Sequence, residues 1–447
     1  MPPKARKRPM PQSLLGRMLT NTIWLVGGKG FGAVCSLLYL AILTRSLGIK
    51  GFGHFSLIFG TSQALVAIAG FQTWRIVVRY GAEYVHTRNW AAFGRLSMLC
   101  GLLDVLGAVL GTVIAWVVFY RFSDALEINP TLIDTAFWFN VAALWALVSA
   151  PTGIVRALDR FDAATYVEAI VPIGRLLAAV AIWLTGPSLI RFLIAWAVID
   201  LIEALLYWLL ARRLAPEAIN WRVMRGWREA LQENAGIVRF FLVTFATASV
   251  DAAIRNGPLL AVGYFAGTKA AGLFRLAQQL SQGLGKLSTL LTRSAYAEIA
   301  RARFAAASGE FRKLVVHTSL LAGGASALVV LLAVLLGKQL LALLGGDDFG
   351  AAHAILVPLT IGAAFELASV AFEPVLHSTG NARQALVAKL LSLGVMIAFI
   401  MLLAQSHSAV GIGWAIALAG AAAYVFAGIM AWRKLDPPPA PEPPAAT

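Results

Sequence analysis

Long apolar runs recur along the chain from Asn21 to Trp432, and short polar breaks separate them. A helix needs roughly 20 mostly apolar residues to cross the hydrocarbon core of a bilayer, and each run is about that long. The runs do not alternate apolar and polar residues with a period of two, so membrane barrel strands are not predicted. The pattern predicts an all-α membrane protein with twelve transmembrane helices, at 21–44, 55–80, 93–119, 132–155, 166–185, 189–210, 237–266, 270–296, 315–336, 352–376, 385–405 and 408–432.

Lys and Arg residues outside the predicted helices fall mainly on one side of the membrane. Of the 37 in the chain, 23 lie on that side, 8 lie inside predicted helices and 6 lie on the other side. Cytoplasmic loops carry an excess of Lys and Arg, so the richer side is predicted to be cytoplasmic, with both termini there. The protein is therefore expected in the inner (cytoplasmic) membrane. The residues of the outer side are Arg45, Lys50, Arg121, Arg191, Lys269 and Lys338.

The composition supports a membrane protein. The chain of 447 residues is 59% hydrophobic and 13% charged, whereas soluble proteins have roughly 25% charged residues. An ordinary water-soluble enzyme is thereby disfavoured. The net charge of +15 reflects the basic cytoplasmic breaks, so it indicates orientation and attraction to anionic membrane lipid, and no nucleic acid partner is expected. Cys35 and Cys100 lie inside apolar runs and are expected to be buried.

The longest break, from Arg212 to Val238, separates the sixth predicted helix from the seventh. Apolar residues recur there at helical spacing among basic ones, which predicts an amphipathic helix at the membrane interface; a solvated linker is the alternative. These residues are Trp221, Met224, Trp227 and Leu231. The predicted organisation is a basic cytoplasmic tail at 1–20, an N-terminal six-helix bundle at 21–213, a cytoplasmic linker at 214–236, a C-terminal six-helix bundle at 237–434 and an extended Pro-rich tail at 435–447.

A motif repeats at an offset of 219 residues. The pattern G-x-K-x-x-G-x-F-x-L follows the first helix of each six-helix half, and an even number of helices gives both halves the same orientation. This is typical of a parallel repeat, in which two bundles face each other across a substrate path. Chance similarity among glycine-rich turns is the alternative, and the matching topological position disfavours it. The first copy holds Gly48, Lys50, Gly53, Phe55 and Leu57, and the second holds Gly267, Lys269, Gly272, Phe274 and Leu276.

At these residues the sequence resembles the polysaccharide flippases of the Wzx type, in the multidrug/oligosaccharidyl-lipid/polysaccharide exporter superfamily. Thr44-Arg45-Ser46-Leu47-Gly48 and Gly51-Phe52-Gly53-His54-Phe55-Ser56-Leu57 resemble the first extracytoplasmic turn and second helix of that family. Val78-Arg79-Tyr80-Gly81-Ala82 is similar to the cytoplasmic end of its second helix, and Gly345-Gly346-Asp347-Asp348-Phe349-Gly350-Ala351-Ala352 to the loop before its tenth helix. The resemblance implies alternating-access translocation of an undecaprenyl diphosphate-linked oligosaccharide, no cofactor, and glycan polymerase and chain-length proteins as partners.

Fifteen charged residues lie inside the predicted helices. A single Arg, Lys or Asp at a helix centre costs about 2.5 to 3.5 kcal/mol on insertion scales, so such residues normally face a cavity or one another. Arg293, Glu168 and Arg75 lie near helix ends and can extend their charged groups to the interface. The full set is Lys29, Arg75, Arg175, Arg255, Arg275, Lys286, Arg293 and Lys389, with Asp104, Glu168, Asp200, Glu203, Asp251, Glu366 and Glu373.

Four of the embedded cations are predicted to bind an anionic head group, because they lie on the first, seventh and eighth helices, between the two halves. Arg suits a diphosphate because its planar fork gives two hydrogen bonds, and Lys acts as a point charge. For Arg255 an ion pair with Asp251, four residues earlier on the same face, is an equal alternative. The four are Lys29, Arg255, Arg275 and Lys286.

The embedded acids suggest two roles. Asp200 and Glu203, spaced i and i+3, share one helical face, as do Glu366 and Glu373, spaced i and i+7. Buried carboxylates can carry protons in exchange for cargo, so coupling to protons or sodium is one hypothesis for Asp200, Glu203, Asp251 and Glu366. Neutralisation of the neighbouring bases is the other. Glu373 precedes Pro374 and is the weakest candidate.

Other chemistry is disfavoured by spacing. Gly27-Gly28-Lys29-Gly30 lacks the spacing of a phosphate-binding loop, and the six histidines include no metal-ligand pair, so neither ATP hydrolysis nor a metal site is expected. A drug or cation antiporter would require an acidic path, and a membrane glycosyltransferase or glycan polymerase would require a large outer loop. A non-transporting scaffold leaves the central charges and the repeat without a purpose. We therefore predict a flippase and not an enzyme.

Overall fold

The computed structural model describes residues 14–122, 127–220, 225–305, 308–369, 372, 382–404 and 409–432, and the side chains of these residues outside 14–29, 285–318, 321 and 382–385. Helices account for nearly all of this part of the chain. Within it there is no strand.

Two long helices each turn back at a glycine of the repeated motif. α1 (Leu14–Ala69) changes direction at Gly48, where φ is 64° and ψ is 179°. α10 (Ile237–Ala305) does so at Gly267, where φ is 80° and ψ is 177°. Glycine adopts a positive φ without the steric cost that other residues incur. The same turn at the same offset in both halves confirms the parallel repeat.

The first bundle continues from α1 through α7. Its elements are α2 (Trp74–His86), α3 (Trp90–Arg121), the 3₁₀ turn η2 (Pro130–Leu132), α4 (Ile133–Trp145), α5 (Ser149–Ala157), α6 (Phe161–Thr185) and α7 (Leu189–Leu214). Two predicted helices, 55–80 and 132–155, are interrupted here: the second arm of α1 ends before α2, and α4 ends before α5. The prediction of continuous helices at these two places was wrong.

A buried junction around Asp104 stabilises both interruptions. The side chain of Asp104, on α3, accepts hydrogen bonds from Thr73 Oγ1 at 2.6 Å and from the backbone N–H of Ala150 at 2.7 Å. Ser149 Oγ accepts from the N–H of Trp74 at 3.0 Å. Unpaired N–H groups at the starts of α2 and α5 would be costly inside a membrane, and these side chains satisfy them.

The second bundle runs from α10 to the last helix. Its further elements are α11 (Ser308–Gly345), the 3₁₀ turn η3 (Asp347–Ala352), α12 (His353–Ala368), α14 (Ala382–Leu403) and α15 (Ala409–Trp432). The predicted loop before the tenth helix is thus the turn η3. Glu373 and Pro374 lie outside the described residues.

The described residues form twelve membrane passages, as predicted. Nine segments are long and apolar enough to cross a bilayer, and two of these, Gly30–Ala69 and Ile237–Leu284, each contain two passages joined at the glycine turn. α7 is of similar length to α6, but it carries Arg191, Asp200 and Glu203 among its apolar residues. The protein is an all-α membrane protein with two six-helix bundles.

The linker between the bundles differs from the amphipathic helix that the sequence predicts. Among its described residues only α9 (Glu229–Glu233) is an α-helix, and Trp221 and Met224 lie outside the described part. α9 binds to the first bundle: Arg95 forms ion pairs with Glu229 and Glu233. Tyr84 donates a hydrogen bond of 3.1 Å to Asn234. These contacts and the positive φ of Gly236 favour a short docked helix over a continuous one.

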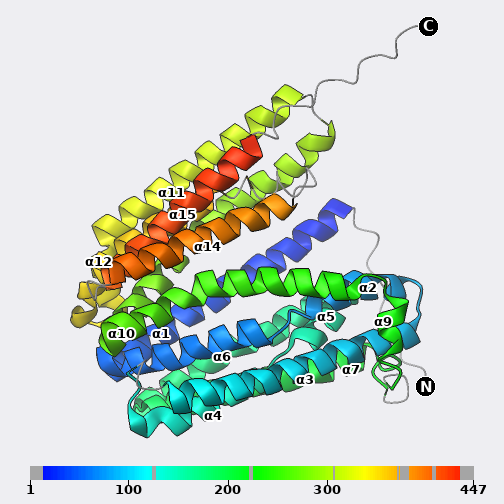
Figure 1. Ribbon diagram of the computed structural model, residues 1–447, viewed down its shortest axis with the longest axis horizontal. Coiled ribbons are helices and arrows are strands. Elements are labelled where there is room, and N and C mark those ends of the chain that lie inside the picture. The colour runs from blue at the N-terminus through cyan, green and yellow to red at the C-terminus, as the bar shows by residue number, and fades with distance from the viewer. Residues whose placement is uncertain are drawn as a thin grey trace.

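The two bundles approach each other at one end and diverge toward the other (Figure 1). α1 and α10 turn at the end where they meet, and we call this the Gly48 end. The opposite end, which holds α2 and α9, we call the α9 end. There α11, α14 and α15 run away from the first bundle, while the start of α10 stays against α2, with the rings of Tyr80 and Phe240 6.0 Å apart.

Candidate functional site

The bundles contact each other most closely through one pair of repeat-related glycines. A Cβ on Gly53 would overlap the carbonyl oxygen of Thr268, and a Cβ on Gly272 would lie 2.8 Å from the carbonyl oxygen of Ile49. Gly272 and Thr268 are the repeat equivalents of Gly53 and Ile49, so the contact is reciprocal. Only glycine permits this approach of two backbones.

Hydrogen bonds add to the contact at the Gly48 end. Thr44 Oγ1 donates to the carbonyl of Leu344 at 3.0 Å, and Arg45 Nη2 donates to the carbonyl of Leu343 at 2.7 Å. The rings of Phe52 and Phe349 pack edge to face with centroids 6.0 Å apart. The space between the bundles is therefore closed at the Gly48 end.

Two arginines from different bundles lie against one aromatic ring, on the second arm of α1 beyond Gly53. Arg175 on α6 and Arg275 on α10 place their Cζ atoms 5.5 and 5.7 Å from the ring centroid of Phe59, which lies on the second arm of α1. A guanidinium within about 6 Å of an aromatic centroid is attracted by the ring electrons. Phe59 thus lies where the two bundles meet, which we call the seam, and each bundle places one arginine against its ring.

Arg175 is neutralised inside the first bundle. Its Nη2 donates to the two carboxylate oxygens of Asp200 at 2.7 and 3.0 Å. Glu203, one turn further along α7, is half-buried. Asp200 on α7 therefore neutralises Arg175 on α6. The sequence did not predict that these two residues pair.

Arg275 differs from Arg175 because its described contacts are uncharged. Its Nη1 donates to Gln278 Oε1 at 3.2 Å, and Gln278 Nε2 donates to the backbone carbonyl of Arg255 at 3.3 Å. Gln278, which is 8% exposed, thus links the guanidinium of Arg275 to the backbone of Arg255 on the other arm of α10. Among the side chains that the structure describes, no carboxylate lies within ion-pair distance of Arg275.

The other predicted residues are placed as follows. Asp251 forms an ion pair of 3.2 Å with Lys389 on α14, so its described partner is not Arg255. The side chain of Arg255 is exposed, as is that of Glu366 on α12. Lys29 lies on the first arm of α1 and Lys286 on the second arm of α10, but their side chains lie outside the described part.

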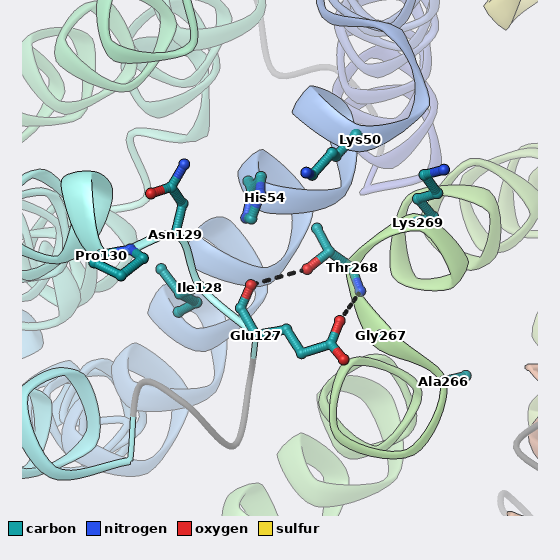
Figure 2. A pocket seen from close by; sticks show the side chains of 10 residues that line it. All are labelled: Lys50, His54, Glu127, Ile128, Asn129, Pro130, Ala266, Gly267, Thr268 and Lys269. Atoms are coloured by element: carbon teal, nitrogen blue, oxygen red, sulfur yellow. Dashed lines mark hydrogen bonds between the residues drawn. The ribbon is translucent and has the colours of Figure 1, made fainter.

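A pocket of about 570 Å³ opens at the Gly48 end, where both lysines of the repeated motif lie (Figure 2). Thr268 Oγ1 donates to the backbone carbonyl of Glu127 at 3.1 Å, and the N–H of Thr268 donates to the Glu127 carboxylate at 3.4 Å. The residues that line the pocket are Lys50, His54, Glu127, Ile128, Asn129, Pro130, Ala266, Gly267, Thr268 and Lys269.

Neither this pocket nor the cluster that Arg175 and Arg275 form at the ring of Phe59 was predicted from the sequence. The lysines were found as motif residues, and their equivalence across the repeat was the available signal for the pocket. Glu127 and Phe59 carry no such signal, because each acts through contacts with a distant part of the chain.

The fold is that of a membrane protein with two six-helix bundles that face each other. The chain belongs to the polysaccharide biosynthesis protein family, which it matches over residues 18–301. It is similar to the inner membrane protein YghQ of Escherichia coli (strain K12), with 28% identity over 348 residues that cover 76% of this chain and 95% of YghQ. It is thus a multi-pass inner membrane protein.

Solved structures share the fold at low sequence identity. The lipid II flippase MurJ in an inward closed conformation matches with a TM-score of 0.70 and 10% identity, over 92% of this chain and 87% of MurJ. An inward-facing multidrug resistance transporter of the MATE family, in the MOP superfamily, matches with a TM-score of 0.67 and 13% identity, over 90% of this chain and 95% of that one. These matches show that the chain shares the fold of MurJ and of the MATE transporter.

Proposed function

We propose that this protein translocates a polyprenyl diphosphate-linked oligosaccharide across the cytoplasmic membrane by alternating access. The observation that carries the proposal is Arg275, a half-buried cation at the seam between the bundles whose described contacts are uncharged. An embedded cation without a carboxylate partner is stabilised by an anionic ligand. A diphosphate matches the planar fork of a guanidinium.

Arg255 and Arg275 form the centre of the proposed binding site, because Gln278 holds the helical arms that carry them together. Lys29 and Lys286 are proposed to add positive charge along the same two long helices. The diphosphate and sugars would occupy the space between the bundles, while the polyprenyl tail stays in lipid. Glycan polymerase and chain-length proteins are the proposed partners on release.

The cycle would proceed by rocking of the two bundles. The structure is closed at the Gly48 end, so cargo would enter from the α9 end, which the distribution of basic residues predicts to be cytoplasmic. Separation of the reciprocal glycine contact would then open the Gly48 end to the outside.

An antiporter of cationic drugs is the rival proposal, since a MATE transporter shares the fold. It would need unneutralised acids between the bundles. Two of the four proposed acids, Asp200 and Asp251, instead form ion pairs with Arg175 and Lys389. This pairing favours the flippase.

The proposal is tested by export in a deletion strain that carries each variant. We expect Arg275→Ala to abolish surface polysaccharide and to cause carrier-linked sugar to accumulate in lipid extracts, at an unchanged protein level. Arg121→Ala removes an exposed cation at the end of α3 and should leave export unchanged. Full export by Arg275→Ala would overturn the proposed site.

Ion coupling is proposed through Glu203 and Glu366. Translocation in proteoliposomes should then respond to a pH or sodium gradient, and Glu203→Gln should remove or weaken that response. If transport ignores both gradients and the membrane potential, the acids only balance charge.

A further inference from the structure

We propose that the pocket at the Gly48 end is a second anion-binding site, distinct from Arg275, which takes a phosphate-type group between the two bundles. The group could belong to a lipid head group or to free phosphate, since both present the same oxygens. The inference does not depend on the identity of the transported molecule.

The pocket presents cations from both halves of the repeat. Lys50 lies on α1 and Lys269 on α10, at equivalent positions two residues after the glycine turns. In Figure 2 the amino group of Lys50 points toward His54, whereas that of the exposed Lys269 lies across the seam beyond Thr268 and points away from Lys50, so Lys269 would turn inward to reach a shared anion. Each ammonium group offers three hydrogen-bond donors and no acceptor.

His54 supplies an independent reason to expect a ligand. Its side chain is 7% exposed, and Nδ1 has no hydrogen-bond partner among the described residues. Buried polar atoms in proteins are nearly always paired, with protein, water or ligand. Nδ1 has almost no accessible surface as the ring stands, so the ring would turn toward the pocket to donate to an anion there.

The remaining polar groups also favour an anion. Asn129 Oδ1 already accepts hydrogen bonds from the N–H and Oγ1 of Thr131, at 3.1 and 3.0 Å, so its NH₂ group remains available as a donor. The one carboxylate of the lining, that of Glu127, is turned toward the backbone of Thr268 (Figure 2). Free donors therefore outnumber free acceptors.

The anion would bridge the bundles, because its donors come from both. It would bind when the Gly48 end is closed and lose part of its donor set when the bundles separate. A ligand that prefers one conformation shifts the population toward it. Occupancy of the pocket would therefore favour the closed Gly48 end.

The test is calorimetric titration of the full-length protein in detergent with two probes, inorganic pyrophosphate and farnesyl diphosphate. We expect both to bind, and the double variant Lys50→Gln/Lys269→Gln to weaken binding at least tenfold. Lys338→Gln removes an exposed lysine near the same end and should bind as the wild type does. Binding of farnesyl diphosphate alone would identify a lipid head group as the source, and equal binding of both would show that free anion suffices.

Two further variants keep the test decisive. Glu127→Gln removes the negative charge of the lining and should tighten binding several-fold, which remains measurable if the double lysine variant does not fold. Arg275→Ala should retain the lysine-dependent binding, so loss of transport and loss of this site are distinguishable. The proposal is overturned if neither probe binds, if the double lysine variant binds like the wild type, or if Glu127→Gln binds no more tightly.

Discussion

The two copies of the repeated turn share a backbone but not their surroundings. Gly48 and Gly267 have nearly the same φ and ψ. A Cβ on Gly48 would meet no atom within 4 Å, whereas a Cβ on Gly267 would lie 2.5 Å from Glu127 Oε2. The repeat therefore supplies a symmetrical frame, and a segment of the first bundle packs onto the second turn only.

The charges at the seam are asymmetrical in the same way. At the offset of 219 residues, Arg255 corresponds to Ser36 and Arg275 to Ser56. Both serine hydroxyls donate to the carbonyl four residues earlier in their own helix, at 2.8 and 2.6 Å. The second bundle thus has arginines at positions where the first has serines whose hydroxyls are already hydrogen-bonded within their own helix. The proposed cargo site therefore belongs mainly to the second half.

The largest effect on export is expected from substitutions at the reciprocal glycine contact, which both halves of the repeat form. Gly53→Ala would drive a methyl group into the backbone of Thr268, so the Gly48 end could not close and export should fall at least about tenfold, equivalent to about 1.4 kcal/mol. Gly272→Ala should do the same less severely, because its Cβ would lie 2.8 Å from Ile49 O. Export is the measurement. Wild-type export by Gly53→Ala would show that this contact is not needed for transport.

Asp104 tests a feature of the first bundle alone, since its repeat equivalent is Gly323. Asp104→Ala would leave Thr73 Oγ1 and the N–H of Ala150 without their acceptor, at about 1–3 kcal/mol for each orphaned group. We expect a lower melting temperature in detergent. Asp104→Asn, which keeps an acceptor oxygen, should lose less, and equal losses would show that charge matters more than the hydrogen bonds.

Alanine at the two turn glycines sharpens the comparison. Gly48→Ala should cost roughly 1–3 kcal/mol, because alanine is strained at this combination of positive φ and extended ψ but meets no neighbouring atom. Gly267→Ala should cost more, since the new methyl group also displaces Glu127. The thermal stabilities of the two variants in detergent give the difference. A Gly48→Ala variant that is as unstable as Gly267→Ala would contradict the asymmetry.

The smallest effect is expected at Ser56. Ser56→Ala removes a hydrogen bond within one helix and should change stability by about 1 kcal/mol or less, with export intact. Arg275→Ser, which gives the second bundle the residue of the first, should abolish export at a similar stability. If Ser56→Ala also abolished export, both halves would contribute to the site.

The sequence predicted features that local physics determines. The apolar runs predicted the twelve passages, and the repeated glycines predicted turns that only glycine adopts easily. The interruptions before Trp74 and Ser149 were missed, because the buried carboxylate that stabilises both lies on a third helix. The described part of the linker contains the short helix α9, and the periodicity of the tryptophans carries no information about its docking on α3.

The candidate site was only partly predictable, for a related reason. Arg255 and Arg275 stood out as charges in apolar runs, yet their link through Gln278 depends on how the two arms of α10 lie together. The ion pair of Asp251 also depends on packing between helices. Arg255 is the nearer base along the chain, but Asp251 pairs with Lys389 on α14. Pairings between helices depend on their rotation about their axes, which a single sequence does not specify.

The junction at Asp104 has a mechanical consequence. One carboxylate secures the start of α2 and the start of α5, so these two half-helices are fastened to each other as well as to α3. Because both helix starts share one acceptor, we expect α2 and α5 to keep their relative position when the first bundle tilts. α3, α6 and α7 run past this level without a break, so we expect any bend within the first bundle to be confined to α2 and α5 and to leave the reciprocal glycine contact in place.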